Sequence, residues 1–185
     1  MNALEILYCF YPEDTPLRRL LLRHSHQVRA KALAIRLKAG VPETDPQLVS
    51  GGALLHDIGI LRCHAPSIFC TGPEPYLAHG QIGGRMLRSF GRERGWDLEA
   101  YARICERHTG AGIRADDVRR QSLPIPAQDW LPETTEEKLI CFADKFFSKS
   151  GDGEEKTMAQ VLKSLSRFGP ETLERFAEMR DLFHF

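Results

Sequence analysis

The amino-acid sequence predicts an all-α domain, and three observations carry that prediction. Apolar residues recur every three or four positions along most of the chain, as on the buried face of a helix. No alternating strand pattern extends beyond a few residues, and no internal repeat is found. The length of 185 residues suits one domain. We expect it to span 1–185, with a core at about 14–149 on which helices within 150–185 pack.

The first half of the chain offers several helices with clear starts or stops. A capping Thr or Asp stands directly before Pro16 and again before Pro46, and Gly40 follows the first of these two helices. The prolines and glycines between 59 and 75 predict an irregular segment. Helices over about 77–94 and 97–108 follow, since each shows an apolar stripe.

The second half begins with a loop and ends in helices. Residues 109–132 read as loop with one short helix near 116–121. Thr134 and Glu137 form a capping box ahead of an apolar run. Two amphipathic helices, over about 154–168 and 171–183, complete the predicted fold.

The composition of the chain disfavours some classes of binding partner and indicates a cellular compartment. The 25 basic and 25 acidic residues cancel at a pI near 7.1, which disfavours a long nucleic acid as partner. The first residues resemble no signal peptide, and no apolar run is long enough for a bilayer, so we expect no membrane partner. Five scattered cysteines without a CxxC pair indicate reduced thiols and a cytoplasmic location.

Polar side chains interrupt the apolar faces of five predicted helices. A lone histidine on such a face is most often a core residue with a backbone partner. An ionised aspartate away from water, however, needs a cation or several donors. A shared metal site explains the whole set better than six separate hydrogen-bonding arrangements, one for each buried side chain. The candidate ligands are His24, His56, Asp57, His79, His108 and Asp144.

Four of these residues stand in three motifs that carry a family resemblance. The stretches "HSHQV" from His24, "LLHDIG" from Leu54 and "FADKF" from Phe142 resemble the signatures of the HD-domain metal-dependent phosphohydrolase superfamily. The resemblance covers about 18–149 and implies a single HD domain, a helical bundle with metal in its interior. It also implies that one metal is held by His24, His56, Asp57 and Asp144.

Two further stretches, "AHGQIGGRML" and "ICERHTGAG", resemble the middle histidine motifs of the bimetallic branch of that family. The resemblance implies a second metal held by Asp57, His79 and His108, with Asp57 bridging. Imidazole and carboxylate suit two divalent transition metal ions such as Fe, Mn, Co, Ni or Zn. Family members that cleave cyclic dinucleotides usually have Lys where this chain has Ile60, and the "GYP" signature is absent.

The expected function is hydrolysis of a small phosphate ester, a nucleotide or dinucleotide, by a metal-bridging hydroxide. Asp57 would act as the bridge, and His64 or Lys145 would protonate the leaving group. Arg62 and Arg114 are candidates for binding the substrate phosphate, although each also fits a solvated charge near a helix end. Two alternatives stay open: a diiron oxygenase with the same ligands, and a non-catalytic nucleotide-binding module. The oligomeric state is not predicted.

Overall fold

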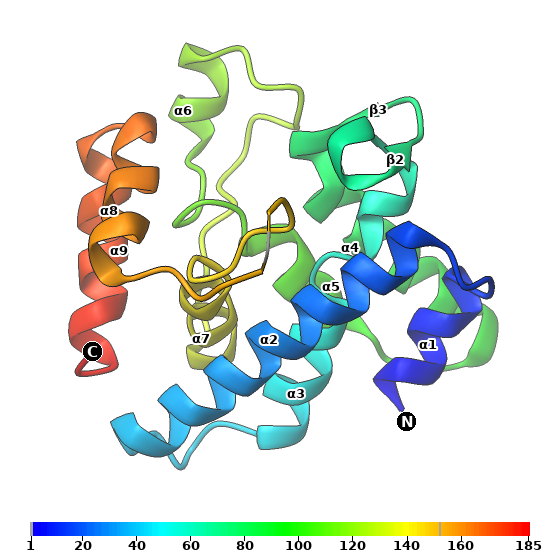
Figure 1. Cartoon of the computed structure of the whole chain (residues 1–185), viewed down its shortest axis with the longest axis horizontal. Helices are drawn as coiled ribbons and strands as arrows, with labels where there is room; N and C mark the ends of the chain where they lie inside the picture. Colours follow the sequence, from blue (N-terminus) through cyan, green and yellow to red (C-terminus); the bar gives the residue numbers. More distant parts are fainter. Residues whose placement is uncertain (1, 152) are drawn as a thin grey trace.

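The computed structural model describes residues 2–151 and 153–185, which form a bundle of helices with one small sheet at its side (Figure 1). The α-helices are α1 (Ala3–Phe10), α2 (Pro16–Ala39), α3 (Pro46–Leu55), α4 (His79–Arg94), α5 (Glu99–Arg107), α6 (Ala115–Arg120), α7 (Thr135–Asp144), α8 (Met158–Leu165) and α9 (Pro170–Leu182). The 3₁₀ helices are η1 (Ile58–Arg62), η2 (Pro66–Ile68), η3 (Tyr76–Ala78) and η4 (Ser166–Phe168). The predicted helical fold is confirmed.

The caps decide where the two N-terminal core helices begin. The hydroxyl of Thr15 accepts the backbone N–H of Arg18 and starts α2, which ends at Gly40 in the left-handed conformation. The carboxylate of Asp45 accepts the N–H of Gln47 and starts α3. The predicted starts and the predicted end are therefore confirmed.

Some predicted boundaries differ from the structure. The capping box of Thr134 and Glu137 begins α7 as predicted. A second capping box at Thr157 starts α8 four residues later than expected, because the hydroxyl of Thr157 satisfies the N–H of Gln160. Helix α1 was not predicted, although Asn2 caps it.

The segment after α3, predicted to be irregular, contains a three-stranded sheet. Strand β1 (Cys63–Ala65) lies between β2 (Cys70–Thr71), which is antiparallel to it, and β3 (Glu74–Pro75), which is parallel. The strands are only two or three residues long, so no alternating pattern predicts them.

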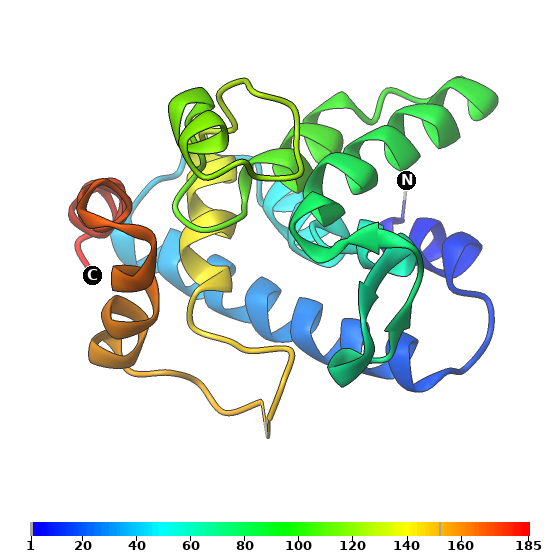
Figure 2. The same ribbon diagram turned by 90° about the horizontal axis from the view of Figure 1, so that it is seen from above.

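Two apolar clusters make up most of the core, and α2 contributes to both. One cluster joins Val28, Ala32 and Ile35 of α2 to the apolar faces of α7, α8 and α9. The other joins Leu17, Leu20 and Leu21 of α2 to α1, α3, α4 and α5. Helices α8 and α9 lie at one end of the molecule and α1 lies at the other (Figure 2).

His24 lies between these two parts of α2, one turn from Leu21 and one turn from Val28. A polar side chain is therefore held, buried, where the two apolar clusters meet. Across residues 2–151 and 153–185, no helix combines the length and apolar composition needed to cross a bilayer.

Candidate metal centre

The structure brings the six predicted ligands together in the interior. Each is less than a tenth exposed, and His56 and Asp57 are fully buried. Five segments far apart in the sequence supply them: the middle of α2, the end of α3, the start of α4, the end of α5 and the end of α7. Their ligand atoms form two groups, His24, His56, Asp57 and Asp144 in one, and Asp57, His79 and His108 in the other.

In the first group, neighbouring donor atoms are spaced as they are around a metal ion. His24 Nε2 lies 2.9 Å from Asp144 Oδ1 and 3.2 Å from Asp57 Oδ2. His56 Nε2 lies 3.0 Å from the same oxygen of Asp57 and 3.3 Å from His24 Nε2. Ligands about 2.1 Å from a metal and about 90–110° apart are separated by about 3.0–3.4 Å. The group fits one divalent ion.

The second group uses the other oxygen of Asp57. Asp57 Oδ1 lies 3.3 Å from His79 Nε2 and 3.4 Å from His108 Nε2. The two Nε2 atoms lie 3.0 Å apart. One carboxylate thus contributes Oδ2 to the first group and Oδ1 to the second. A bridging carboxylate has this arrangement.

Backbone contacts leave Nε2 of three imidazoles directed at the centre. Each of the three has its Nδ1 within hydrogen-bonding distance of the backbone carbonyl three residues earlier. The pairs are His56 with Ala53 at 2.8 Å, His79 with Tyr76 at 2.7 Å, and His108 with Cys105 at 2.7 Å. Such bonds fix the ring orientation of metal-binding histidines, because an Nδ1–H that donates leaves Nε2 with a lone pair.

The facing imidazoles of His79 and His108 are suited to holding a cation. Burial lowers the pKa of His79 to about 3 and also lowers the pKa of His108, so both rings are neutral at pH 7. With both Nδ1 protons donated to carbonyls, two Nε2 lone pairs point at each other across 3.0 Å. A metal ion turns this repulsion into two bonds.

The buried carboxylates are ionised and are in contact with lysines. Burial alone would raise the pKa of Asp57, but the neighbouring positive charges of His56 and Lys149 hold it well below its usual value. Lys149 Nζ lies 2.6 Å from Asp57 Oδ2, and Lys145 Nζ lies 2.6 Å from Asp144 Oδ2. Neither oxygen of Asp57 accepts a well-formed hydrogen bond from the described residues. A carboxylate whose Oδ2 has only the ion pair with Lys149 and whose Oδ1 has no donor, together with facing lone pairs, fits divalent metal ions.

A glycine lets the "HDIG" segment approach α4. A Cβ on Gly59 would lie 2.0 Å from the backbone oxygen of His79 and 2.5 Å from the backbone nitrogen of Gly83. Only glycine therefore allows η1 to lie against the first turn of α4. This contact places Asp57 beside His79.

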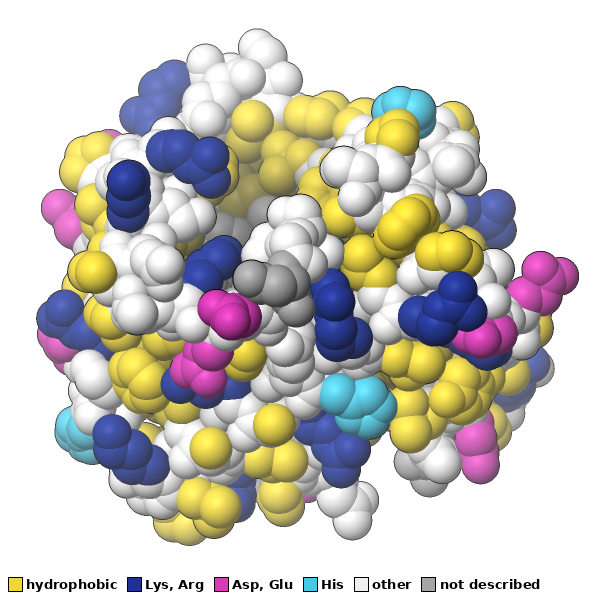
Figure 3. Space-filling model, viewed as in Figure 1, with side chains coloured by type: hydrophobic (Ala, Val, Ile, Leu, Met, Phe, Trp, Pro, Cys, Tyr) yellow, Lys and Arg dark blue, Asp and Glu magenta, His cyan; other side chains and the backbone are white. Residues whose placement is uncertain are grey.

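Two cavities border the centre, and Asp144 lines both. One, of about 330 Å³, is also lined by Lys145 and by residues of α8 and η4. The other, of about 340 Å³, is also lined by Lys149 and Tyr76. The first opens as a hollow in Figure 3, with hydrophobic side chains inside and Lys and Arg side chains near its edge. Each cavity thus has one lysine next to a metal-type carboxylate.

The four residues predicted to bind substrate or to donate a proton are placed differently. Lys145 lies at the centre. Arg62 and His64 are exposed and line neither cavity. In β1 the side chain of Cys63 points inward, so that of His64 points outward. Arg114 lines a separate cavity with Pro132 and Leu182.

Lys149 was missed by reasoning from the sequence. It follows α7 by five residues, in a segment that is no longer helical, so helical spacing gives no signal for its direction. Lys156 and Arg167, which line the first cavity, were missed too, because the helix predicted over 154–168 is shorter in the structure: Lys156 precedes α8 and Arg167 lies in η4.

The HD-domain family model matches residues 21–148, which is more than half of the chain. The chain belongs to the HD-domain family. The match includes all six of the buried imidazole and carboxylate ligands.

Curated relatives include archaeal proteins of greater length. An uncharacterized protein of Methanocaldococcus jannaschii is 40% identical over 115 residues, which are 62% of this chain and 57% of that protein. A tRNA (cytidine(56)-2'-O)-methyltransferase of Thermoplasma volcanium is 30% identical over 96% of this chain and 44% of its own length. The corresponding enzyme of Picrophilus torridus is 34% identical over 70% of this chain and 32% of its own length. This chain thus spans about a third to somewhat over half of these relatives.

Solved structures show the same fold. The HD domain of the L. monocytogenes phosphodiesterase PgpH superposes with a TM-score of 0.52 at 19% identity, covering 92% of this chain and 96% of that domain. The same domain in complex with cyclic-di-AMP gives a TM-score of 0.51 at 18% identity, covering 89% and 88%.

Proposed function

We propose that this HD-domain chain is a phosphohydrolase that binds two divalent transition metal ions and cleaves a small phosphate ester, a nucleotide or dinucleotide. The observation that carries the proposal is the position of Asp57, whose two oxygens face two separate groups of ligands. His24, His56, Asp57 and Asp144 would hold one ion, and Asp57, His79 and His108 the other. When bound, such a pair of ions lowers the pKa of a shared water and polarises phosphoryl oxygens.

The side chains of the protein would hold the substrate through their charge. Asp57 and Asp144 supply two negative charges to a centre whose other ligands are neutral imidazoles, so two divalent ions leave an excess of positive charge. Lys145 and Lys149 add two more positive charges beside it. An anionic phosphoryl group is attracted to such a site. Lys145, which lies on the cavity side of Asp144, would protonate the leaving oxygen.

The comparisons support hydrolysis at the level of the family. One structural neighbour is the HD domain of a phosphodiesterase, and one structure of that domain is in complex with cyclic-di-AMP. Two relatives are tRNA methyltransferases, but this chain spans 44% and 32% of their length. Their name describes proteins more than twice as long, and methyl transfer does not call for two groups of buried imidazoles and carboxylates. We therefore propose hydrolysis for this chain.

The lysines favour hydrolysis over the oxygenase alternative. A diiron oxygenase could use the same six ligands, but dioxygen is neutral and gains little from two ammonium groups at the carboxylates. The test is a screen of phosphate esters with the Mn²⁺- and Co²⁺-loaded protein, in parallel with oxygen uptake by the iron-loaded protein. Phosphate release supports the proposal. Oxygen uptake without phosphate release supports the oxygenase, and nucleotide binding with neither supports a binding module.

A further inference from the structure

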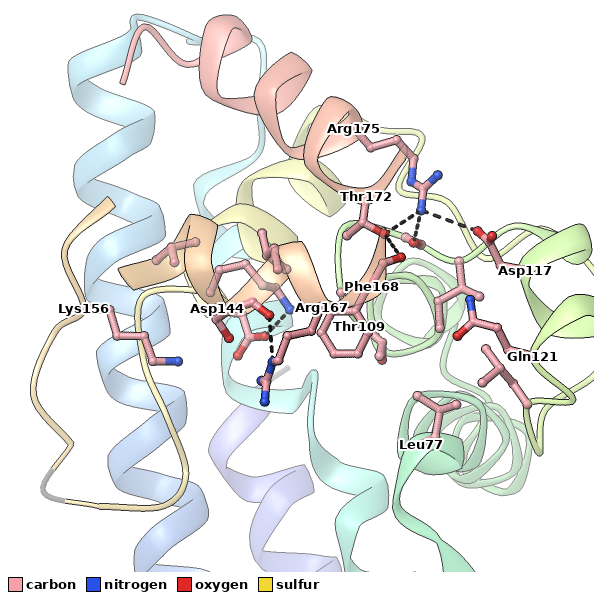
Figure 4. A pocket seen from close by; sticks show the side chains of 18 of the residues that line it. Leu77, Thr109, Asp117, Gln121, Asp144, Lys156, Arg167, Phe168, Thr172 and Arg175 are labelled. Atoms are coloured by element: carbon pink, nitrogen blue, oxygen red, sulfur yellow. Dashed lines mark hydrogen bonds and ion pairs between the residues drawn. The ribbon is translucent and has the colours of Figure 1, made fainter. Parts of the chain in front are cut away.

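The cavity of about 330 Å³ beside Asp144 has two chemically different ends. Figure 4 shows Lys156, Asp144 and Arg167 toward one side and Leu77 and Gln121 toward the other. The ring of Phe168 lies between them. The basic end is the one that adjoins the candidate metal centre, since Asp144 belongs to both.

The basic end has two cations without acidic partners. Of the charged residues that line the cavity, Asp144 pairs with Lys145, and Asp117 pairs with Arg175. Lys156 and Arg167 form no ion pair among the residues that the structure describes, and Lys156 is half-buried. Lys156 is thus a half-buried ammonium without a carboxylate partner, which suits an anionic ligand. Arg167 adds an exposed guanidinium whose Nε donates to the backbone carbonyl of Ser164.

The other end offers flat apolar surface with polar groups at its margin. Phe168 is 52% exposed, which is unusual for a phenyl ring, and the guanidinium carbon of Arg167 lies 5.9 Å from the centre of this ring. Apolar side chains of Leu77, Ile113 and Leu123 line the same space, and Gln121 supplies an amide. An amide can both donate and accept hydrogen bonds.

We propose that this cavity is a nucleoside site: it binds the base and sugar of a nucleoside monophosphate whose phosphate lies at the Asp144 end. The base would stack on Phe168, its polar edge would meet Gln121, and Lys156 and Arg167 would contact phosphate oxygens. The volume is at the lower end of the range for small-molecule sites, about 300–1,000 Å³, so it suits one nucleotide. The proposal rests on the hydrolysis proposed above, and it narrows the substrate to esters with a flat ring system.

The test separates ring recognition from phosphate recognition. The probes are phosphonate analogues of AMP and of ribose 5-phosphate, in which carbon replaces the ester oxygen so that neither is hydrolysed. Binding to the Mn²⁺-loaded chain of 185 residues is measured by calorimetry. We expect the AMP analogue to bind at least about 10-fold more tightly, because stacking of a base on an aromatic ring contributes that much.

Variants then assign the difference to residues. Phe168→Ala should remove the preference for the AMP analogue, and Phe168→Tyr should retain it. Lys156→Ala should weaken both analogues by about the same factor, about 10-fold. The matched controls are Lys163→Ala, an exposed lysine of α8 outside the cavity, and Leu37→Ala, an exposed apolar residue of α2. Both controls should bind the analogues as the parent does.

The outcomes distinguish this inference from the proposed function. Equal binding of the two analogues, or no effect of Phe168→Ala, overturns the nucleoside site, even if phosphate is released from many esters. Tight binding of the AMP analogue that depends on Phe168 supports the nucleoside site. If no ester then releases phosphate with any metal, hydrolysis fails while the nucleoside site stands.

Discussion

Lys149 Nζ lies 2.6 Å from Asp57 Oδ2, the carboxylate oxygen that also faces His24 and His56. A lysine ammonium and a divalent ion are both attracted to the same buried oxygen. Lys149 thus offsets the charge of Asp57 when no metal is bound, and it opposes metal binding through repulsion.

The first prediction follows from that contact. Lys149→Met should destabilise the chelator-treated protein by about 3 kcal/mol, because it leaves a buried carboxylate unpaired. The metal-loaded protein should lose much less stability, since bound ions neutralise the carboxylate of Asp57 in place of the ammonium. The measurement is a pair of melting curves, with and without chelator, for parent and variant. Equal destabilisation in both states would show that Lys149 and metal do not share Asp57.

The second prediction concerns Gly59. Gly59→Ala should cost about 3 kcal/mol or more, because the added methyl meets the backbone of α4 rather than a movable side chain. It should also weaken metal binding at His79, which begins α4. Gly40→Ala is a useful contrast: its Cβ meets no atom within 4 Å, so that variant reports only the cost of the left-handed backbone. Normal metal content in a folded Gly59→Ala protein would contradict this account of the "HDIG" segment.

The third prediction concerns the protonation of His56 and its effect on metal binding at different pH. Burial alone would lower the pKa of His56, but the carboxylates of Asp57 and Asp144 raise it to about 9 in the metal-free protein. This group therefore stabilises the metal-free fold fully below about pH 6.5, and the contribution is lost as pH rises to about 9. Metal binding requires neutral His56, so it should release a proton in this window.

The stabilisation given by metal should accordingly grow between about pH 6.5 and pH 9. Below about pH 6.5 the metal-free protein itself should lose stability as pH falls, since His79 and His108 are held neutral by burial while the unfolded chain takes up protons. The checks are calorimetry in buffers of different ionisation enthalpy and melting curves across the range. If the stabilisation given by metal does not change with pH above about pH 6.5, His56 is not a ligand that releases a proton on metal binding.

The fourth prediction separates the two groups of ligands. His79→Ala and His108→Ala should each remove about one metal ion per chain and abolish turnover while the protein stays helical, because only one of several ligands is lost. His26→Ala is the matched control, since His26 is exposed on α2 and lies outside both groups. Metal analysis and circular dichroism test this. Unchanged metal content in both variants would show that the second group holds no ion.

Sequence periodicity was sufficient for the helices and for the burial of the six candidate ligands, because each of them occupies an inward position of a helical stripe or of its end. Periodicity could not predict the short strands, since two or three residues cannot show a period. Periodicity also could not predict the positions of Lys149, Lys156 and Arg167, because irregular or 3₁₀ backbone places these residues near the centre. Arg62 and His64 follow the ligands in the sequence, yet both are exposed and line neither cavity beside the centre.

The central claim is that Asp57 bridges two metal ions, and metal content of the Asp57→Asn variant tests it most directly. Asn keeps the shape of the side chain but loses the charge that lets two cations lie close together. The account predicts about two ions per chain in the parent protein and close to none in Asp57→Asn, each measured on folded, monodisperse protein. An Asp57→Asn protein that still holds two ions per chain would contradict it.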